Sequence, residues 1–276
     1  MVRFLSVTAI TLEYNSSNKF TEMLLENRLD KEVERIAFSF NLPLNLLLYS
    51  KYRLKYNRIY PNGIKYDIYA FFCTLFLGVL CFYRIFTLNM TNASMSYMER
   101  AILTVVPILF FTIYFIGFVI VFVSDIVYKD NNVLLILTIQ TIHRRISFSK
   151  TNHSFNMWTH ISFATVILVN LITRGTFYLT CRYSHVSEEI SDIVRDFSFV
   201  TTDVNMVIAT RIIILLKQYI DLWIKAILTT NVAQDPDLYC QKLFGVYMNI
   251  LKAYKIYRKV FQALVSFDFY IFHLII

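Results

Sequence analysis

The stretch 101-AILTVVPILFFTIYFIGFVIVFV-123 contains no charged residue and is the strongest single signal of the fold class. As an α-helix this stretch is long enough to cross the hydrocarbon core of a bilayer, which is about 30 Å thick. The composition agrees, because 57% of the chain is hydrophobic and 17% is charged, whereas soluble domains carry about 25% charged residues. The sequence therefore predicts an all-α fold, a polytopic transmembrane helix bundle.

Further apolar runs have the length of membrane-spanning helices. They cover about 67–88, 158–181 and 197–216, and a partial fifth span covers 261–276. The predicted organisation is a cytoplasmic N-terminal region, 1–66, followed by a transmembrane helical region, 67–276. Near the start of the first span, Pro61-Asn62-Gly63 predicts a turn.

Amphipathic segments accompany these runs. The segment 20–38 has the pattern of a helix, with Leu24, Leu25 and Leu29 near one face. The segment 132-NVLLILTIQTIHRRI-146 predicts an interfacial helix or an extension of the second span. The segment 217–227 prolongs the fourth span, and the basic segment 241–260 leads into the last one.

Lysine and arginine are distributed unevenly among the segments that flank the spans. Residues 51–66 contain five, residues 125–156 four and residues 217–259 seven, whereas residues 89–100 and 183–196 contain one each. Because cytoplasmic loops are enriched in positive charge, the N-terminus is predicted to be cytoplasmic. The expected protein is a multi-pass protein of the plasma membrane, inverted relative to G-protein-coupled receptors.

This topology bears on the glycosylation signals of the chain. Asn89 and Asn92 each begin an Asn-x-Ser/Thr sequon within 89–100, on the predicted outer side. Both are therefore predicted glycosylation sites. The sequons at Asn15 and Asn152 fall on the cytoplasmic side and are expected to stay unmodified.

No motif of an enzyme or of a nucleic-acid-binding domain is present. The chain has no Gly-rich phosphate loop, no H-E-x-x-H and no G-x-S-x-G. Its basic residues flank apolar runs instead of forming a separate basic region. We expect no catalytic residues, no cofactor, no metal site and no nucleic-acid partner. The cysteines are expected to be buried free thiols, since none forms a C-x-x-C pair.

Polar and aromatic residues within the spans are the candidates for ligand binding. Polar side chains are costly in lipid and face protein or water, and aromatic walls with a few polar groups suit a small ligand. The candidates are Phe110, Phe111, Tyr114, Asn170, Arg174, Tyr178, Asp203 and Asn205. The competing interpretation is structural: Arg174 and Asp203 pair with each other, and the aromatic rows only pack.

Two stretches resemble the insect gustatory receptor family. They are 50-SKYRLKYNRIYPNGIKYDIYAFF-72, like the entry to that family's first span, and 247-YMNILKAYKIYRKVFQALVSFDFYIF-272, like the approach to its fifth. The resemblance implies a seven-helix subunit of a tetrameric, ligand-gated cation channel, either homomeric or formed with other receptor subunits. It also implies a small tastant in an outer pocket, a pore lined by the seventh helix, and an anchor made by the cytoplasmic ends of helices four to seven.

The predicted function is therefore that of a gustatory receptor subunit in a lipid bilayer, gated by a tastant. Bitter compounds are favoured over sugars because a sugar-receptor pattern is not evident. The chain is expected to be incomplete, since it stops before a sixth and a seventh span. The alternatives are an odorant receptor of the related insect family, a multi-span transporter and a non-conducting remnant.

Overall fold

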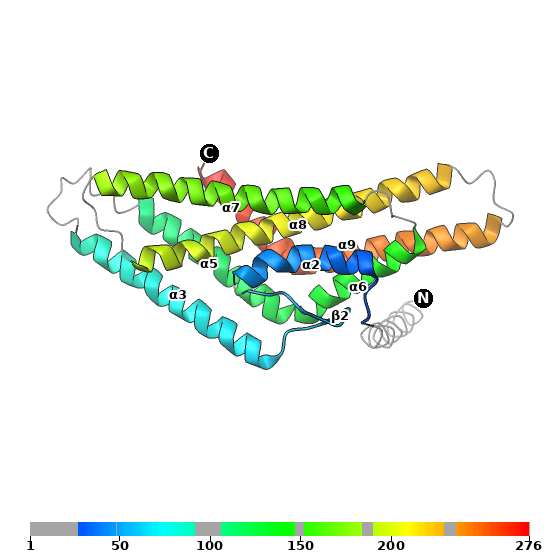
Figure 1. The fold of residues 1–276 in the computed structure, drawn as a ribbon, viewed down its shortest axis with the longest axis horizontal. Helices are drawn as coiled ribbons and strands as arrows, with labels where there is room; N and C mark the ends of the chain where they lie inside the picture. The colour runs from blue at the N-terminus through cyan, green and yellow to red at the C-terminus, as the bar shows by residue number, and fades with distance from the viewer. Residues whose placement is uncertain are drawn as a thin grey trace, which may run out of the picture.

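Long helices that run roughly along one axis make up the molecule (Figure 1). The computed structural model describes residues 27–47, 49–91, 106–146, 152–183, 190–228 and 236–275. The elements are α2 (Lys31–Leu46), β1 (Arg53–Lys55), β2 (Arg58–Tyr60), α3 (Ile64–Thr91), α5 (Val106–Val127), α6 (Lys129–Arg145), α7 (Asn152–Tyr183), α8 (Ile190–Leu228) and α9 (Pro236–Ile275). Apart from one short hairpin, the prediction of an all-α fold is confirmed for these residues.

The connections between the long helices alternate between the two ends of the molecule. The end of α3, the start of α5, the end of α7 and the start of α8 lie at the left of Figure 1. The end of α8 and the start of α9 lie at the far right, and α9 then runs back toward the left. Neighbouring long helices are therefore antiparallel, because the chain reverses direction at each end of the molecule.

The helix α2 covers the second part of the helix predicted at 20–38, whose residues 20–26, with Leu24 and Leu25, lie outside the described residues. Residues 27–30 are extended and Arg28 forms a β-bridge with Arg58, so α2 starts at Lys31. Its buried residues recur at helical spacing and face one side; they include Val33, Ile36, Ala37, Phe40 and Leu44. This face enters a single core with α6, α8 and α9.

The helix α6 corrects the prediction of an interfacial helix or an extension of the second span. Residues 132–140 are all buried, so no face of this stretch is free for lipid. The chain bends at Tyr128 (φ −109°, ψ 23°), and α6 leaves the direction of α5 to pack mainly against α9. The physical reason is that five consecutive apolar residues, 133–137, cover every side of the helix, and such a helix is buried.

The strands β1 and β2 form a hairpin before the first long helix. Arg53 pairs with Tyr60, and Lys55 pairs with Arg58. The turn residues Tyr56 and Asn57 have φ of 52° and 58°, which is the backbone of a two-residue hairpin turn with positive φ at both positions. The turn predicted at residues 61–63 is the irregular link from β2 to α3.

A second, smaller core joins α3, α5 and α9. Its buried residues are Tyr49, Ala70, Leu77, Phe118, Val121, Phe122 and Leu264. Glycines allow the close approach: a Cβ on Gly78 would lie 3.0 Å from the Phe115 ring, and one on Gly117 would lie 2.9 Å from the Phe267 ring. The first pair joins α3 to α5, and the second joins α5 to α9.

Two segments of the described residues are long and apolar enough to cross a membrane. They are Ile64–Tyr83 in α3 and Ser154–Thr173 in α7, and a shorter apolar stretch covers Phe115–Val127. Both long segments keep most of their surface outside the protein core, with 28% and 17% of the residues buried. Large apolar side chains such as Phe72 and Leu171 are exposed along them.

Candidate functional site

Two of the predicted ligand-binding residues, Asn170 and Asp203, contact each other. The Asn170 amide donates a hydrogen bond of 3.2 Å to the carboxylate of Asp203. The same amide group also donates to the carbonyl oxygen of Val166, at 3.0 Å. The contact joins α7 to α8 and leaves both side chains partly exposed. The contact holds the Asp203 carboxylate in a fixed position between α7 and α8.

A second polar contact joins the same helices farther along. Arg211 on α8 donates to the Trp158 carbonyl oxygen, at 2.6 Å, and to the Ser162 hydroxyl. Ser162 lies eight residues before Asn170, and Arg211 lies eight residues after Asp203. The equal spacing means that α7 and α8 keep one antiparallel register over about 12 Å.

Asn205 does not join this set of contacts. It is fully buried, and its amide donates to the Thr201 carbonyl oxygen of its own helix, at 2.9 Å. Residues two apart on a helix point in nearly opposite directions, so Asn205 faces away from Asp203. Its side-chain oxygen is buried without a hydrogen-bond partner.

The other predicted residues have side chains outside the described part of the chain. The backbone places Phe110, Phe111 and Tyr114 on α5 and Arg174 and Tyr178 on α7. Arg174 and Tyr178 follow Asn170 at steps of four, so the helix presents all three on one side. The suggested pair of Arg174 and Asp203 stays a prediction.

The predicted glycosylation sites lie at the end of the first long helix. Asn89 falls within α3, which continues to Thr91, and its side chain lies outside the described part. Asn92 lies outside the described residues altogether. Both sites therefore stay predictions.

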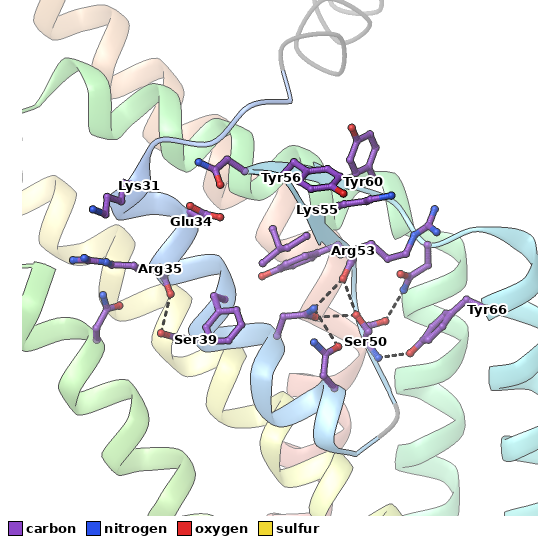
Figure 2. Close-up of a pocket in the computed structure, with 18 of the residues that line it drawn as sticks. Lys31, Glu34, Arg35, Ser39, Ser50, Arg53, Lys55, Tyr56, Tyr60 and Tyr66 are labelled. Atoms are coloured by element: carbon purple, nitrogen blue, oxygen red, sulfur yellow. Dashed lines mark hydrogen bonds between the residues drawn. The ribbon is translucent and has the colours of Figure 1, made fainter.

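A separate groove, which the sequence reasoning missed, lies beside α2. Its cavity volume is about 1190 Å³, and Figure 2 shows its walls, α2 on one side and the hairpin on the other. The first turns of α7 and α3 complete it through Asn156, His160 and Tyr66. The charged residues that line it are Lys31, Glu34, Arg35, Arg53 and Lys55.

Buried hydrogen bonds fix the floor of this groove. The Asn41 amide donates to the Tyr52 carbonyl oxygen at 2.9 Å, and the Asn41 side-chain oxygen accepts from the Ser50 hydroxyl at 3.1 Å. Asn62 donates to the Ser50 carbonyl oxygen at 2.6 Å. The Tyr52 phenol donates to the Ala37 carbonyl oxygen at 2.8 Å. The segment before the hairpin is thus held to α2 by directed contacts.

Two tyrosines of the same segment stay neutral. Burial raises the pKa of the Tyr52 phenol far above its ordinary value. Burial also raises the pKa of Tyr49, and the nearby carboxylate of Asp125 raises it further. Both phenols are therefore protonated across the physiological range, and among the described residues of the groove wall Glu34 alone carries negative charge.

An ion pair ties this segment to the helices that follow. The ammonium of Lys51 lies 2.5 Å from a carboxylate oxygen of Asp125, with only 7% and 10% of the side chains exposed. The same ammonium lies 5.1 Å from the centre of the Phe261 ring. Lys129 and Asp67 form a second, more exposed pair at 3.0 Å. The floor of the groove is therefore anchored to α5 and α9.

Comparison of the chain with known protein families, with curated proteins and with solved structures finds no match. Within the part of the chain that the structure describes, no three His, Cys, Asp or Glu side chains gather closely enough to hold a metal ion. Of the cysteines in that part, Cys81 is buried and Cys73 half-buried, but Cys240 is exposed, which corrects its prediction as buried.

One feature of the sequence corresponds to the hairpin wall of the groove. Residues 51–66 interleave lysines and arginines with tyrosines. The positive charge of this run by itself indicates only the flank of a span. The hairpin folds the run back on itself, which brings Arg53, Lys55, Tyr56 and Tyr60 to one wall. The pattern alone does not reveal that α2 supplies the opposite wall.

Proposed function

We propose that the chain is a membrane-embedded subunit of a chemoreceptor with the layout of insect gustatory receptors. In this proposal the left end in Figure 1 faces the outside of the cell, and the end that contains α2, α6 and the α8–α9 connection faces the cytoplasm. The subunit binds a small tastant in its outer half and contributes to the gating of a cation channel, as one of four subunits.

One observation carries the membrane part of this proposal. α3 and α7 leave large apolar side chains in contact with solvent along most of their length, at successive turns; they include Phe71, Leu75, Phe76, Val79 and Phe82 on α3 and Ile161, Leu168, Leu171 and Ile172 on α7. A soluble monomer rarely exposes a contiguous apolar surface beyond a few hundred Å². Lipid is the solvent that such a surface requires.

The contacts between α7 and α8 support a ligand site in the outer half. Asn170 and Asp203 form a polar pair on facing helices, and an intramembrane carboxylate marks a functional site by default. A ligand that competes for the Asp203 carboxylate would change how α7 and α8 pack. It can shift a closed-to-open equilibrium only by its difference in affinity for the two states.

α8 is long enough to connect the proposed ligand site with the other end of the molecule. α8 runs without a break from Ile190 to Leu228, a rise of nearly 60 Å, which exceeds the thickness of a bilayer. From Val204, next to Asp203, to Tyr219 it contributes buried residues to the core shared with α2, α6 and α9. A displacement of α8 in the membrane therefore moves residues in the predicted cytoplasmic anchor.

The unbroken helices favour a receptor over a transporter. Transporter sites are typically built from helices that are interrupted near the middle of the membrane. α3, α7, α8 and α9 are each continuous. An odorant receptor of the related insect family would share this layout and differs in the ligand class that it binds.

Ligand binding is tested by thermal unfolding of the detergent-purified chain with panels of bitter plant compounds and sugars. A binding compound at 100 times its Kd stabilises the folded state by about 2.7 kcal/mol. We expect a bitter compound to raise the unfolding temperature of the wild type and of Thr173→Ala, whose hydroxyl donates to its own helix. The rise should be smaller in Asn170→Ala. Equal responses of the two variants, or no response of the wild type, would reject this site.

Channel function needs a second readout. Cells that express the chain together with a seven-helix gustatory receptor are loaded with a calcium indicator and exposed to the compound that stabilises the chain. We expect the response to differ from that of the seven-helix receptor alone. An unchanged calcium response would reject participation in gating and leave ligand binding as a separate result.

A further inference from the structure

The groove beside α2 carries a cluster of four cations, of which Lys55 lies 5.2 Å from the centre of the Tyr56 ring. Lys31, Arg35, Arg53 and Lys55 line it, and none of them forms an ion pair with another described residue. Among the described residues that line it, Glu34 supplies the one carboxylate. Four exposed cations around one concavity repel one another, and an anionic ligand relieves that repulsion.

Three other cations of the same region are paired. Lys51 pairs with Asp125, Lys129 pairs with Asp67, and Arg144 donates to both carboxylate oxygens of Asp30 at 2.8 and 2.9 Å. Arg58 and Lys65 lie outside the groove and, like the lining cations, form no ion pair with another described residue. What sets the lining cations apart is that all four surround one concave surface.

The size and the aromatic content of the groove favour a ring-bearing anion over a simple ion. Its volume of about 1190 Å³ reaches the upper end of small-molecule sites, about 300–1,000 Å³. Tyr56 and Tyr60 lie on the hairpin wall beside Lys55 (Figure 2). Guanidinium groups bind phosphate in a bidentate manner, and lysine supplies a point charge. A polyol ring that carries several phosphates matches this combination.

The position of the groove indicates where such a ligand comes from. Tyr66 lies in the first turn of α3, and Asn156 and His160 lie at the start of α7. These are the helices with the exposed apolar surfaces, and Trp158, at the level of the groove but on the other side of α7, is itself exposed. Tryptophan is enriched at the level of lipid headgroups. A headgroup in the groove would leave its acyl chains next to α3 and α7.

We propose that this groove binds a multiply phosphorylated inositol headgroup, supplied by a phosphoinositide of the cytoplasmic leaflet. Arg53 and Lys55 on the hairpin and Lys31 and Arg35 on α2 neutralise the phosphates from opposite sides. The phosphate chemistry depends on the groove alone. The lipid as its source depends on the membrane orientation in the proposed function.

The test measures binding of the full chain in detergent micelles to three fluorescent probes. These are a short-chain phosphatidylinositol bisphosphate, inositol trisphosphate and a short-chain phosphatidylserine. We expect the phosphoinositide to bind most tightly. Arg53→Ala/Lys55→Ala should weaken its binding by at least about tenfold, since each charge-assisted hydrogen bond contributes on the order of 1.5–3 kcal/mol.

The matched control removes the same charge from the same region. Arg58 and Lys65 are exposed and belong to β2 and to the first turn of α3, but they do not line the groove. Arg58→Ala/Lys65→Ala should change the affinity by less than about threefold, because exposed charges outside the site act only through a screened field. Thermal unfolding of each variant verifies folding, and Lys31→Ala/Arg35→Ala replaces the hairpin variant if that one unfolds.

Each other outcome overturns a defined part of the proposal. Equal weakening by both double variants would mean that only net charge matters and would reject the groove as the site. Phosphatidylserine binding as tight as that of the phosphoinositide would reject recognition of the inositol phosphates. Inositol trisphosphate binding as tight as the lipid would assign the groove to a soluble ligand. Loss of the membrane orientation with retained inositol trisphosphate binding would separate this proposal from the proposed function.

Discussion

At the residue scale, Lys51 shows what local sequence patterns can and cannot reveal. The sequence counts it among five cations that flank the first span. The structure instead buries its side chain to 7% exposure and pairs it with Asp125, 74 residues away. Hydropathy and charge counts describe neighbours in sequence, so a contact across that separation is invisible to them. The same limit applies to the contact between Asn170 and Asp203, whose residues were predicted as candidates but not as partners.

The buried pair leads to a stability prediction. Asp125→Ala leaves the Lys51 ammonium buried without a counter-charge, and such a loss costs about 3–5 kcal/mol. We expect a correspondingly lower free energy of unfolding in detergent, with much of the loss recovered in Lys51→Met/Asp125→Leu. Asp67→Ala, which breaks the more exposed pair with Lys129, should cost about 1 kcal/mol or less. Equal losses for Asp125→Ala and Asp67→Ala would contradict the assigned role of the buried pair.

At the element scale, the sequence predicts the long helices but only part of how they pack and where they begin. The segments 217–227 and 241–260 were predicted to prolong helices, and both lie within α8 and α9, so these predictions are confirmed. α6 was wrongly assigned because apolar residues around a whole helix fit lipid and a protein core equally well. Residues 27–30 were predicted as helix and are extended instead, because they pair with the hairpin, a tertiary contact that overrides local helix pattern.

Helix packing gives a prediction with a control in the same chain. Gly117→Val places a side chain against the Phe267 ring, where even a Cβ would lie 2.9 Å away. Overpacking of this kind costs about 1–3 kcal/mol, so the unfolding temperature should fall. Gly175 has no atom within 4 Å of its added Cβ, and Gly175→Ala should be neutral or stabilise by up to about 1 kcal/mol. An unchanged melt for Gly117→Val would contradict the close contact of α5 with α9.

At the scale of the whole molecule, two zones differ in what surrounds them. One zone consists of helices with exposed apolar surface, α3 and most of α7; the other is a packed core of α2, α6, α8 and α9. The sequence predicts the first zone because apolar runs are local. It does not predict the groove, since α2 and the hairpin meet there with the start of α7, which follows them by about 100 residues.

The central claim is that lipid surrounds the first zone, with the groove on the cytoplasmic side. Single cysteines at Arg100, Ser187, Lys55 and Lys242, in a chain whose four native cysteines are replaced by serine, test it directly. A membrane-impermeant maleimide is applied to intact cells and, separately, to permeabilised cells. The account predicts labelling of Arg100→Cys and Ser187→Cys on intact cells, and of Lys55→Cys and Lys242→Cys only after permeabilisation. Labelling of Lys55→Cys on intact cells would contradict it.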